Sequence, residues 1–163
     1  MASGDSLQTF HPYHNEPPAS NYATLDFRNN QPVLDFDDTT AEYAIFSTIL
    51  PRNYGGGGIT VYVHFSCTSA TSGTGGWTIE FERIGDGSQD TDSDSFATAQ
   101  TITAVTVPGT SGNVKIANVA VSNGANMDSI AVGEKFRLRV KRDVSNDTAS
   151  GDLELHGVEL KET

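Results

Sequence analysis

The sequence predicts an all-β protein built as an antiparallel β-sandwich or barrel, and three observations support this. Apolar and polar residues alternate without a break from Ile59 to Cys67, which is typical of a strand with one buried and one solvated face. The same two-residue period returns at residues 77–81 and 136–140. Gly, Pro, Asn or Asp clusters separate these runs, and no stretch of comparable length has helical spacing.

Nine segments have the pattern of strands, and we expect eight or nine of them to form. They are residues 25–27, 34–36, 42–50, 58–67, 77–84, 96–107, 113–121, 135–142 and 152–161. The first two are identical Leu-Asp-Phe triplets that flank a turn, and Pro32 places the second near a sheet edge. The residues expected in the core are Val61, Val63, Phe65, Ile79, Phe81, Phe136 and Leu138.

Two of these strands change phase, because their apolar residues switch faces between Ile116 and Val119 and again between Leu155 and Val158. A β-bulge in each strand would return both sets to the core, and Gly157 is the natural bulge in the last strand. Residues 126–133 form the one helix candidate, since Asn126 can cap its start and Gly133 can end it.

Residues 1–22 differ from the rest. They contain three prolines, three aromatic residues and two histidines but no alternation, so we expect an extended N-terminal arm ahead of one domain at residues 23–163. Disorder is the alternative for a terminal segment, although disordered tails are usually poor in aromatic residues. The residues expected to dock on a partner are Phe10, His11, Pro12, Tyr13, His14 and Tyr22.

Composition limits the possible partners. The 163 residues suffice for one core, and 21 acidic against 10 basic residues give a net charge of −11, which disfavours direct binding to nucleic acid or to an anionic membrane. Cys67 is the one cysteine and lies on an apolar strand face, so it is expected to be a buried hydrophobe. No leader or membrane-spanning run is recognisable, which predicts a soluble protein made in a cytoplasm.

The loop from Asp86 to Ser95 contains carboxylates at Asp90, Asp92 and Asp94, the spacing that opens a calcium-binding loop. The glycine and the bidentate glutamate of that motif are missing. We therefore expect a solvated acidic loop with no metal.

The run Tyr54, Gly55, Gly56, Gly57 and Gly58 lacks the Lys-Ser/Thr ending and the following helix of a phosphate-binding loop. It is either a flexible interstrand connection or a place where another chain approaches closely. We expect it to be an interface loop.

Basic residues line the outward face of one strand at Lys135, Arg137, Arg139 and Lys141. A stripe of this kind could touch nucleic acid, but pairing with acidic residues of the next strand, Glu154 and Glu159, is favoured.

No residues combine into a catalytic site. The histidines, including His64 and His156, lack zinc-ligand spacing, and no serine lies in a Gly-x-Ser-x-Gly turn. Glu80 and Glu82 share an outward strand face, which is ordinary surface. The sequence therefore predicts no enzyme, no catalytic residue and no cofactor.

Five segments carry distinctive turn and strand signatures: residues 34–40, 49–57, 81–84, 94–96 and 131–143. Together they resemble small jelly-roll virion proteins of tailed bacteriophages. The resemblance implies a jelly-roll β-sandwich of about eight strands that acts as a capsid cement or decoration protein. It also implies a homotrimer bound to major capsid protein subunits on the outer capsid surface of a virion.

The alternative function is a carbohydrate-binding or receptor-binding module on a phage tail or fibre, with Tyr54, Tyr62 or Trp77 as aromatic platforms. Aromatic rings exposed in a groove would favour sugar binding. A flat apolar patch with an ordered arm would favour the cement role.

Overall fold

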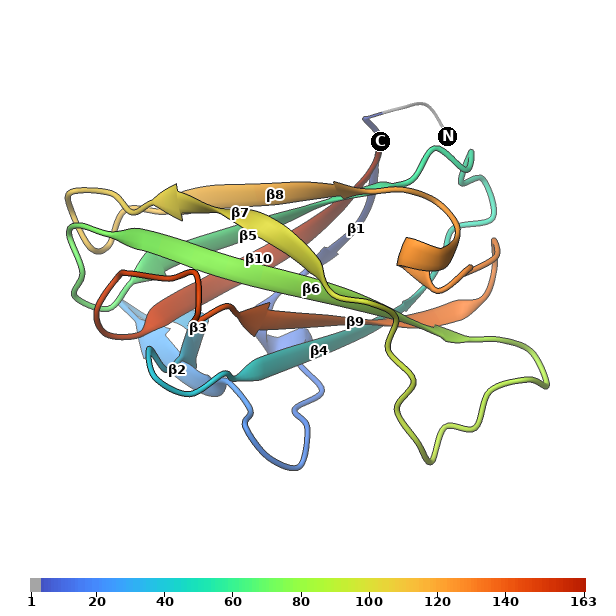
Figure 1. Cartoon of the computed structure of the whole chain (residues 1–163), viewed down its shortest axis with the longest axis horizontal. Helices are drawn as coiled ribbons and strands as arrows, with labels where there is room; N and C mark the ends of the chain where they lie inside the picture. Colours follow the sequence, from blue (N-terminus) through green and yellow to red (C-terminus); the bar gives the residue numbers. More distant parts are fainter. Residues whose placement is uncertain (1–3) are drawn as a thin grey trace.

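The computed structural model describes residues 4–163 as two antiparallel sheets packed face to face (Figure 1). The first sheet has the order β2-β3-β10-β5-β8, with β1 also paired to β10, and the second has the order β4-β9-β6-β7. The strands are β1 (Ser6–Phe10), β2 (Thr24–Arg28), β3 (Gln31–Phe36), β4 (Tyr43–Ile49), β5 (Ile59–Cys67), β6 (Thr74–Ile84), β7 (Gln100–Thr106), β8 (Lys115–Val121), β9 (Lys135–Arg142) and β10 (Leu153–Glu162). The predicted antiparallel sandwich is confirmed.

The core lies between the two sheets and is formed by the inward residues of alternating strands. All seven side chains predicted for it are buried, as is the thiol of Cys67. Trp77 is the largest of the buried residues, and its ring packs edge-on against Phe36 and Phe65, with centroids 5.0 and 5.4 Å away. Burial of this apolar face is the main force that holds the sheets together.

One of the two predicted bulges is present. The pairing of β10 with β5 shifts register between Leu155 and Gly157, so Val158 returns to the core as expected. The bulge predicted in residues 113–121 is wrong, because β8 pairs with β5 without a shift. Ile116 instead stays on the solvated face at 48% exposure, and Ala117 takes the inward position.

The prediction that residues 1–22 form an arm outside the domain is wrong for β1. This strand pairs with β10 and so belongs to the first sheet. Phe10 is 1% exposed and stacks on Phe46 of β4, with ring centroids 5.1 Å apart. The sandwich therefore includes part of the segment assigned to the arm. The apolar area of Phe10 is already removed from water within its own chain.

After β1, the chain crosses to the second sheet and covers the edge of β4. The N–H of Glu16 donates to the carbonyl of Ile45 at 2.7 Å, and Asn15 Oδ1 accepts from the N–H of Ile45 at 3.0 Å. The N–H of Ala23 then donates to the carbonyl of Tyr43 at 3.0 Å. Residues 15–23 thus satisfy an edge that would otherwise be open to aggregation.

The two short helical turns are 3₁₀ turns, η1 (Pro12–His14) and η2 (Ala125–Met127). The helix predicted for residues 126–133 is therefore reduced to η2, which ends at Asp128 in the left-handed conformation, with φ 52°. Two consecutive residues with positive φ, Asp128 and Ser129, prevent an α-helix from continuing. Within the described residues, no helix has the length and apolar character needed to span a membrane.

Candidate functional site

The β2–β3 hairpin at the edge of the first sheet carries the exposed apolar residues of the candidate site. Its two-residue turn is Asn29-Asn30, and both residues have positive φ, 47° and 64°. This is the turn whose twist matches that of the flanking strands, and asparagine tolerates it better than most residues. The turn fixes the register, so that Leu25 lies opposite Leu34.

The inward face of β2 is exposed, although it continues the core face of the sheet. Leu25 and Phe27 point to the same side as Leu34 of the core, yet they are 45% and 55% exposed, while Leu34 is 1% exposed. β2 is the edge strand of the first sheet and pairs only with β3. Its inward side chains are therefore covered less than those of the strands inside the sheet.

The turn η1 brings an aromatic ring to this face. Pro12 is buried and fixes the start of the turn, while Tyr13 projects outward at 63% exposure. The rings of Tyr13 and Phe27 lie in tilted contact with centroids 6.4 Å apart. Tyr22, at 49% exposure, reaches the same region from the segment that precedes β2.

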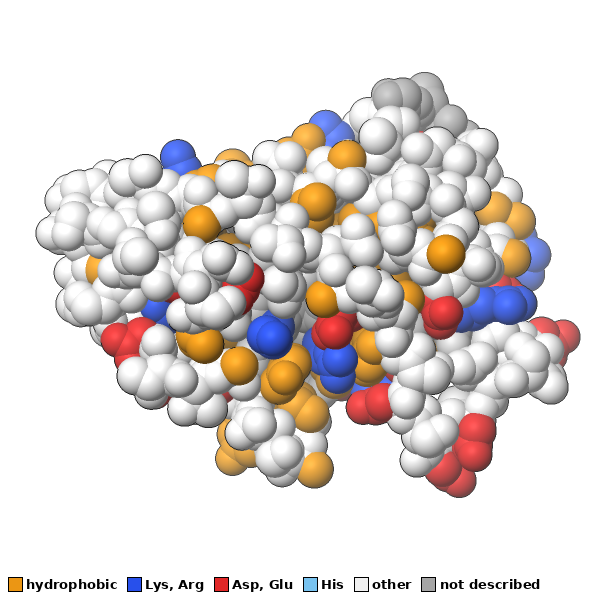
Figure 2. All heavy atoms as spheres, in the orientation of Figure 1, with side chains coloured by type: hydrophobic (Ala, Val, Ile, Leu, Met, Phe, Trp, Pro, Cys, Tyr) orange, Lys and Arg blue, Asp and Glu red, His pale blue; other side chains and the backbone are white. Residues whose placement is uncertain are grey.

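These four side chains, Tyr13, Tyr22, Leu25 and Phe27, are named the aromatic patch. Next to it is an open groove of about 290 Å³. Its lining residues are Pro12, Tyr13, Asn15, Pro17, Tyr22, Ala23, Thr24, Leu25 and Leu34. Figure 2 shows hydrophobic side chains gathered over the N-terminal loop that lies below the sandwich. A contiguous exposed apolar surface of this kind marks an interaction site.

The groove has hydrogen-bonding groups but no charge. Asn15 uses its Oδ1 to hold the backbone of Ile45, which leaves the amide N–H₂ group as a donor. Tyr13, Tyr22 and Thr24 each add a hydroxyl group. No Lys, Arg, Asp or Glu lines the groove. The site can therefore take an uncharged ligand that has both apolar faces and hydroxyl groups.

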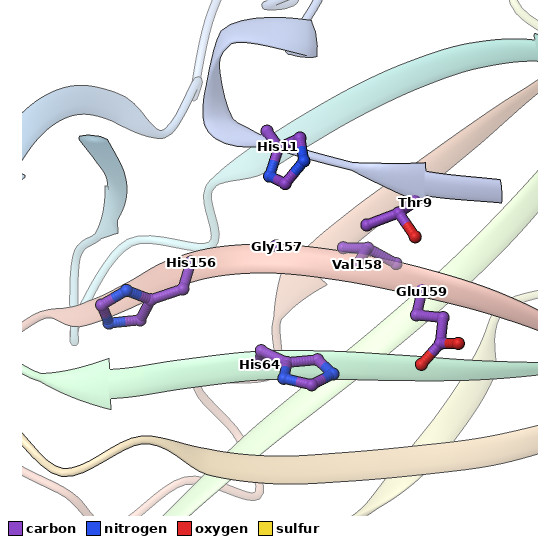
Figure 3. Close-up of a pocket in the computed structure, with 7 residues that line it drawn as sticks. All are labelled: Thr9, His11, His64, His156, Gly157, Val158 and Glu159. Carbon is purple, nitrogen blue, oxygen red and sulfur yellow. The ribbon is translucent and has the colours of Figure 1, made fainter. Parts of the chain in front are cut away.

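A second hollow of about 240 Å³ lies on the outer face of the first sheet (Figure 3). It is lined by Thr9, His11, His64, His156, Gly157, Val158 and Glu159. His11 and His64 lie on opposite sides of β10 in this view, with Gly157 between them. Because the bulge residue has no side chain, it leaves the floor of the hollow open.

The histidines of this hollow do not form a metal site. Their rings do not converge on one point (Figure 3), and the part of the chain that the structure describes holds no group of three residues suited to a metal. His156 Nε2 is 2.9 Å from the hydroxyl of Ser66, and burial lowers the pKa of its imidazole. Burial thus favours the neutral form of this imidazole.

The six predicted docking residues separate into two groups. Tyr13 and Tyr22 are exposed in the aromatic patch, and His11 and His14 are also exposed. Phe10 and Pro12 are buried, which corrects their assignment as docking residues, because their apolar area is covered by their own domain. Contact between the exposed members and a partner stays a prediction.

The predicted interface loop is largely explained by contacts within the chain. Tyr54 is 8% exposed, and its hydroxyl accepts from the N–H of Gly58 at 2.7 Å, so its assignment to an interface is corrected. Gly58 has φ +101°, and a Cβ there would lie 2.5 Å from the carbonyl of Val121. Gly55, Gly56 and Gly57 remain exposed.

Two of the three suggested aromatic platforms are wrong for the same reason. Tyr54 and Trp77 are buried, at 8% and 0% exposure. Tyr62 is partly exposed on the first sheet, where the ammonium group of Lys161 lies 5.6 Å from its ring centroid.

The basic stripe on β9 pairs with β6, so the predicted partners Glu154 and Glu159 are wrong. Arg139 lies opposite Glu80, and Arg137 donates to Glu82 at 2.7 Å. Figure 2 shows basic and acidic side chains interleaved in this region. The guanidinium groups are thus engaged in ion pairs within the sheet.

The acidic loop at residues 86–95 is tied to the same face at its end. Arg137 donates to Asp94 at 2.6 Å, and the N–H of Ser95 donates to Glu82, whose side chain is fully buried. Within the loop, Asp90 Oδ1 accepts from the N–H of Asp92 at 3.0 Å. The carboxylates therefore serve hydrogen bonds and ion pairs, and the absence of a metal stays a prediction.

Comparisons with known proteins identify the fold. No protein-family model matches the chain, and no curated protein sequence matches it. Among solved structures, the CBM22-1–GH10 part of Clostridium thermocellum endo-1,4-β-D-xylanase 10B in complex with xylohexaose matches with a TM-score of 0.52 and 11% identity. The match covers 98% of this chain and 29% of that chain.

Two further structures show the same architecture. An arabinose-bound α-L-arabinofuranosidase, MgGH51, matches with a TM-score of 0.53 and 11% identity over 98% of this chain and 26% of its own. The xylan-binding module CBM15 matches with a TM-score of 0.50 and 8% identity over 96% of this chain and 97% of its own. The chain thus spans less than a third of the two enzymes and nearly all of the module. At these identities the matches establish a jelly-roll sandwich fold.

Proposed function

We propose that this chain is a non-catalytic carbohydrate-binding module that holds a neutral glycan on the aromatic patch. The observation that carries the proposal is the exposure of Tyr13 and Tyr22 in an uncharged groove, with the exposed ring of Phe27 in contact with Tyr13. Rings exposed in a groove are the feature that the sequence reasoning assigned to sugar binding rather than to capsid binding.

The chemistry of the groove matches that of a pyranose ring. A sugar presents an apolar C–H face, which packs against aromatic rings, and a rim of hydroxyl groups, which need donors and acceptors. Tyr13 and Tyr22 supply the ring faces, and Asn15 and Thr24 supply amide and hydroxyl groups. Because no Lys or Arg lines the groove, a sulfated or uronic acid chain would gain no ion pair there.

Solved structures of the same fold support this proposal. The xylan-binding module CBM15 is named for its polysaccharide, and the C. thermocellum xylanase modules were solved with xylohexaose. The proposal extends only the class of ligand to this chain, since the identities are too low for any residue to be carried over.

The setting of the module is a second part of the proposal. The resemblance to virion proteins of tailed phages supports a place on a phage tail or fibre, where a glycan-binding module would attach the particle to a cell surface. The same exposed patch could instead contact capsid subunits or another copy of the chain, so the experiment must separate glycans from proteins.

The experiment measures binding of the full chain to immobilised neutral polysaccharides, including xylan and β-glucan, to acidic polysaccharides and to undecorated capsid shells. Retention on a neutral polysaccharide, with chemical-shift changes at Tyr13 and Tyr22, is the expected result. Retention on shells alone would favour the cement role. Sedimentation under the same conditions tests whether self-association covers the patch.

A further inference from the structure

A third hollow, of about 270 Å³, lies at the turn end of the β2–β3 hairpin. Arg28 follows the inward residue Phe27 on β2, so its side chain points to the outer face, where it forms an ion pair with Glu154. The hollow is lined by Arg28, Asn29, Gln31, Gly112, Val114 and His156. It therefore has one permanent cation and no carboxylate in its lining, unlike the uncharged groove beside the aromatic patch.

The guanidinium group of Arg28 is engaged on one side and free on another. Its Nη1 atom donates to the carbonyl of Cys67 at 2.9 Å and to Glu154, which uses both of its protons. Its Nη2 atom makes one long contact, of 3.5 Å, with the hydroxyl of Ser111. Nε donates to no group among the described residues, so the edge formed by Nε and Nη2 keeps a free N–H on each nitrogen. This edge has the fork geometry that binds both oxygens of a carboxylate.

Gly112 leaves that edge open. A Cβ at this position would lie 3.0 Å from Nη2 and 3.3 Å from Nε of Arg28. The φ of Gly112 lies outside the left-handed region, so the backbone there does not require glycine. The side chain of Arg28 is 30% exposed, so a ligand can reach it. The missing side chain at Gly112 thus gives access to the free edge.

His156 supplies a hydrogen-bond acceptor to the same hollow. The hydroxyl of Ser66 has a single proton, which it donates to Glu154 at 2.7 Å. The contact of 2.9 Å between this hydroxyl and His156 must therefore have Nε2 of the imidazole as the donor. Burial lowers the pKa of His156 and so favours the neutral ring. In that form Nδ1 carries no proton and can accept from a ligand hydroxyl.

The remaining lining and a neighbouring charge narrow the class of ligand. Asn29 and Gln31 carry amide groups that both donate and accept, and Val114 offers apolar surface at 51% exposure. Asp26 is two residues before Arg28 on the same face of β2, outside the lining. A ligand with several negative charges would meet this carboxylate. The hollow therefore suits a ligand with one carboxylate and several hydroxyl groups.

We propose that this hollow is a second ligand site, which binds a sugar acid through the free edge of Arg28. The carboxylate accepts from Nε and Nη2, the sugar hydroxyl groups bond to His156 Nδ1 and to the two amides, and a C–H face packs on Val114. The site lies on the opposite face of the hairpin from Leu25 and Phe27, so it does not rest on the proposed function. It would bind the acidic sugars for which the groove beside the aromatic patch has no cation.

The experiment follows the backbone amide signals of the full chain by NMR during titration with glucuronate, with N-acetylneuraminate and with glucose, at constant pH and ionic strength. Saturable shifts at residues 28–31 and 111–114 with at least one acid, with a Kd on the order of millimolar, are the expected result. The acid that binds distinguishes a uronic from a sialic acid. Glucose should bind at least about tenfold more weakly, since it lacks the carboxylate. Absence of these shifts with both acids, or equal binding of glucose, would overturn the proposal.

Gly112→Ala is the sharpest variant, because it places a methyl group against the free edge and leaves the pair of Arg28 with Glu154 in place. It should weaken acid binding by at least about tenfold. Gly109→Ala is the matched control in the same loop, since a Cβ there meets no atom within 4 Å, and it should bind as the wild type does. Unchanged acid affinity in Gly112→Ala, or an equal loss in Gly109→Ala, would contradict the assignment.

Arg28→Lys keeps the positive charge but removes the planar fork, so it should also weaken acid binding by about tenfold or more. Wild-type affinity in this variant would show that the fork does not hold the carboxylate. If Arg28→Lys does not fold, Gly112→Ala decides, because Gly112 is exposed and its substitution leaves every hydrogen bond of Nη1 intact.

Discussion

β5 and β2 have the same alternating pattern but different environments. Val61 and Val63 of β5 are fully buried, whereas Leu25 and Phe27 of β2 are 45% and 55% exposed on the same side of the same sheet. β5 lies in the interior of the sheet, and β2 is its edge strand. Alternation therefore tells which way a side chain points, but not whether anything lies opposite it. We place the ligand on this exposed inward face of β2.

The largest expected effect tests the buried side of this comparison. Phe10→Ala should lower the free energy of unfolding by about 3 to 5 kcal/mol, because the ring is enclosed and stacks on Phe46. Phe27→Ala, which removes an exposed ring of the same size, should change it by less than about 0.5 kcal/mol. Chemical denaturation measures both. Similar losses in the two variants would show that the contrast between the two regions is false.

A second prediction concerns the bulge that brings Val158 back to the core. A Cβ at residue 157 would lie 2.9 Å from the carbonyl of Phe10, so Gly157→Ala should cost about 1 to 3 kcal/mol through strain between β1 and β10. Gly87→Ala is the comparison variant. A Cβ at Gly87 would meet no other atom within 4 Å, so its only cost is the backbone strain of a φ of +63°. Thermal unfolding that ranks Gly157→Ala as the milder change would contradict the close packing of β1.

A third prediction uses the sign of the Asp35 pKa shift. Because the folded pKa is raised to about 7, the stability that this group provides is complete below the ordinary aspartate value and is lost as pH rises toward 7. Asp35→Asn should thus be more stable than the wild type at pH 8, by about 1 to 2 kcal/mol after allowance for solvent screening. At pH 4 the gain should vanish. A constant difference at both pH values would attribute it to packing.

The smallest expected effect is on affinity. Tyr13→Ala should weaken glycan binding by about tenfold, since one aromatic contact contributes about 0.5 to 1.5 kcal/mol. Tyr62→Ala, which removes a partly exposed ring on the other face of the first sheet, is the matched control and should bind as the wild type does. Isothermal titration calorimetry measures the glycan affinity of both variants. Equal losses would move the ligand away from the aromatic patch.

Much of the fold could be predicted because the core strands keep a strict two-residue period, as β5, β6 and β9 do. β1 escaped prediction since its pairing with β10 shifts register between Ser6 and Gln8, which removes the alternation. The partners of Arg137 and Arg139 were also missed. Sequence order suggested β10, but the sheet order places β6 beside β9.

The candidate site was predicted only in part. Tyr13 and Tyr22 stood out as aromatic residues in a proline-rich segment, but Leu25 and Phe27 read as ordinary core residues of a strand. The available signal was the short hairpin with its Asn29-Asn30 turn and Pro32, which marks an edge. No pattern in the sequence shows that the inward side chains of this edge strand stay about half exposed.

The most direct test of the central claim, that the inward face of β2 is left open for a ligand, is affinity electrophoresis in gels that contain xylan or β-glucan. We expect a neutral polysaccharide to retard the wild type and the double variant Tyr13→Ala/Phe27→Ala to migrate freely, while both proteins unfold at similar temperatures. Equal retardation of the two proteins, or free migration of the wild type in every polysaccharide, would contradict it.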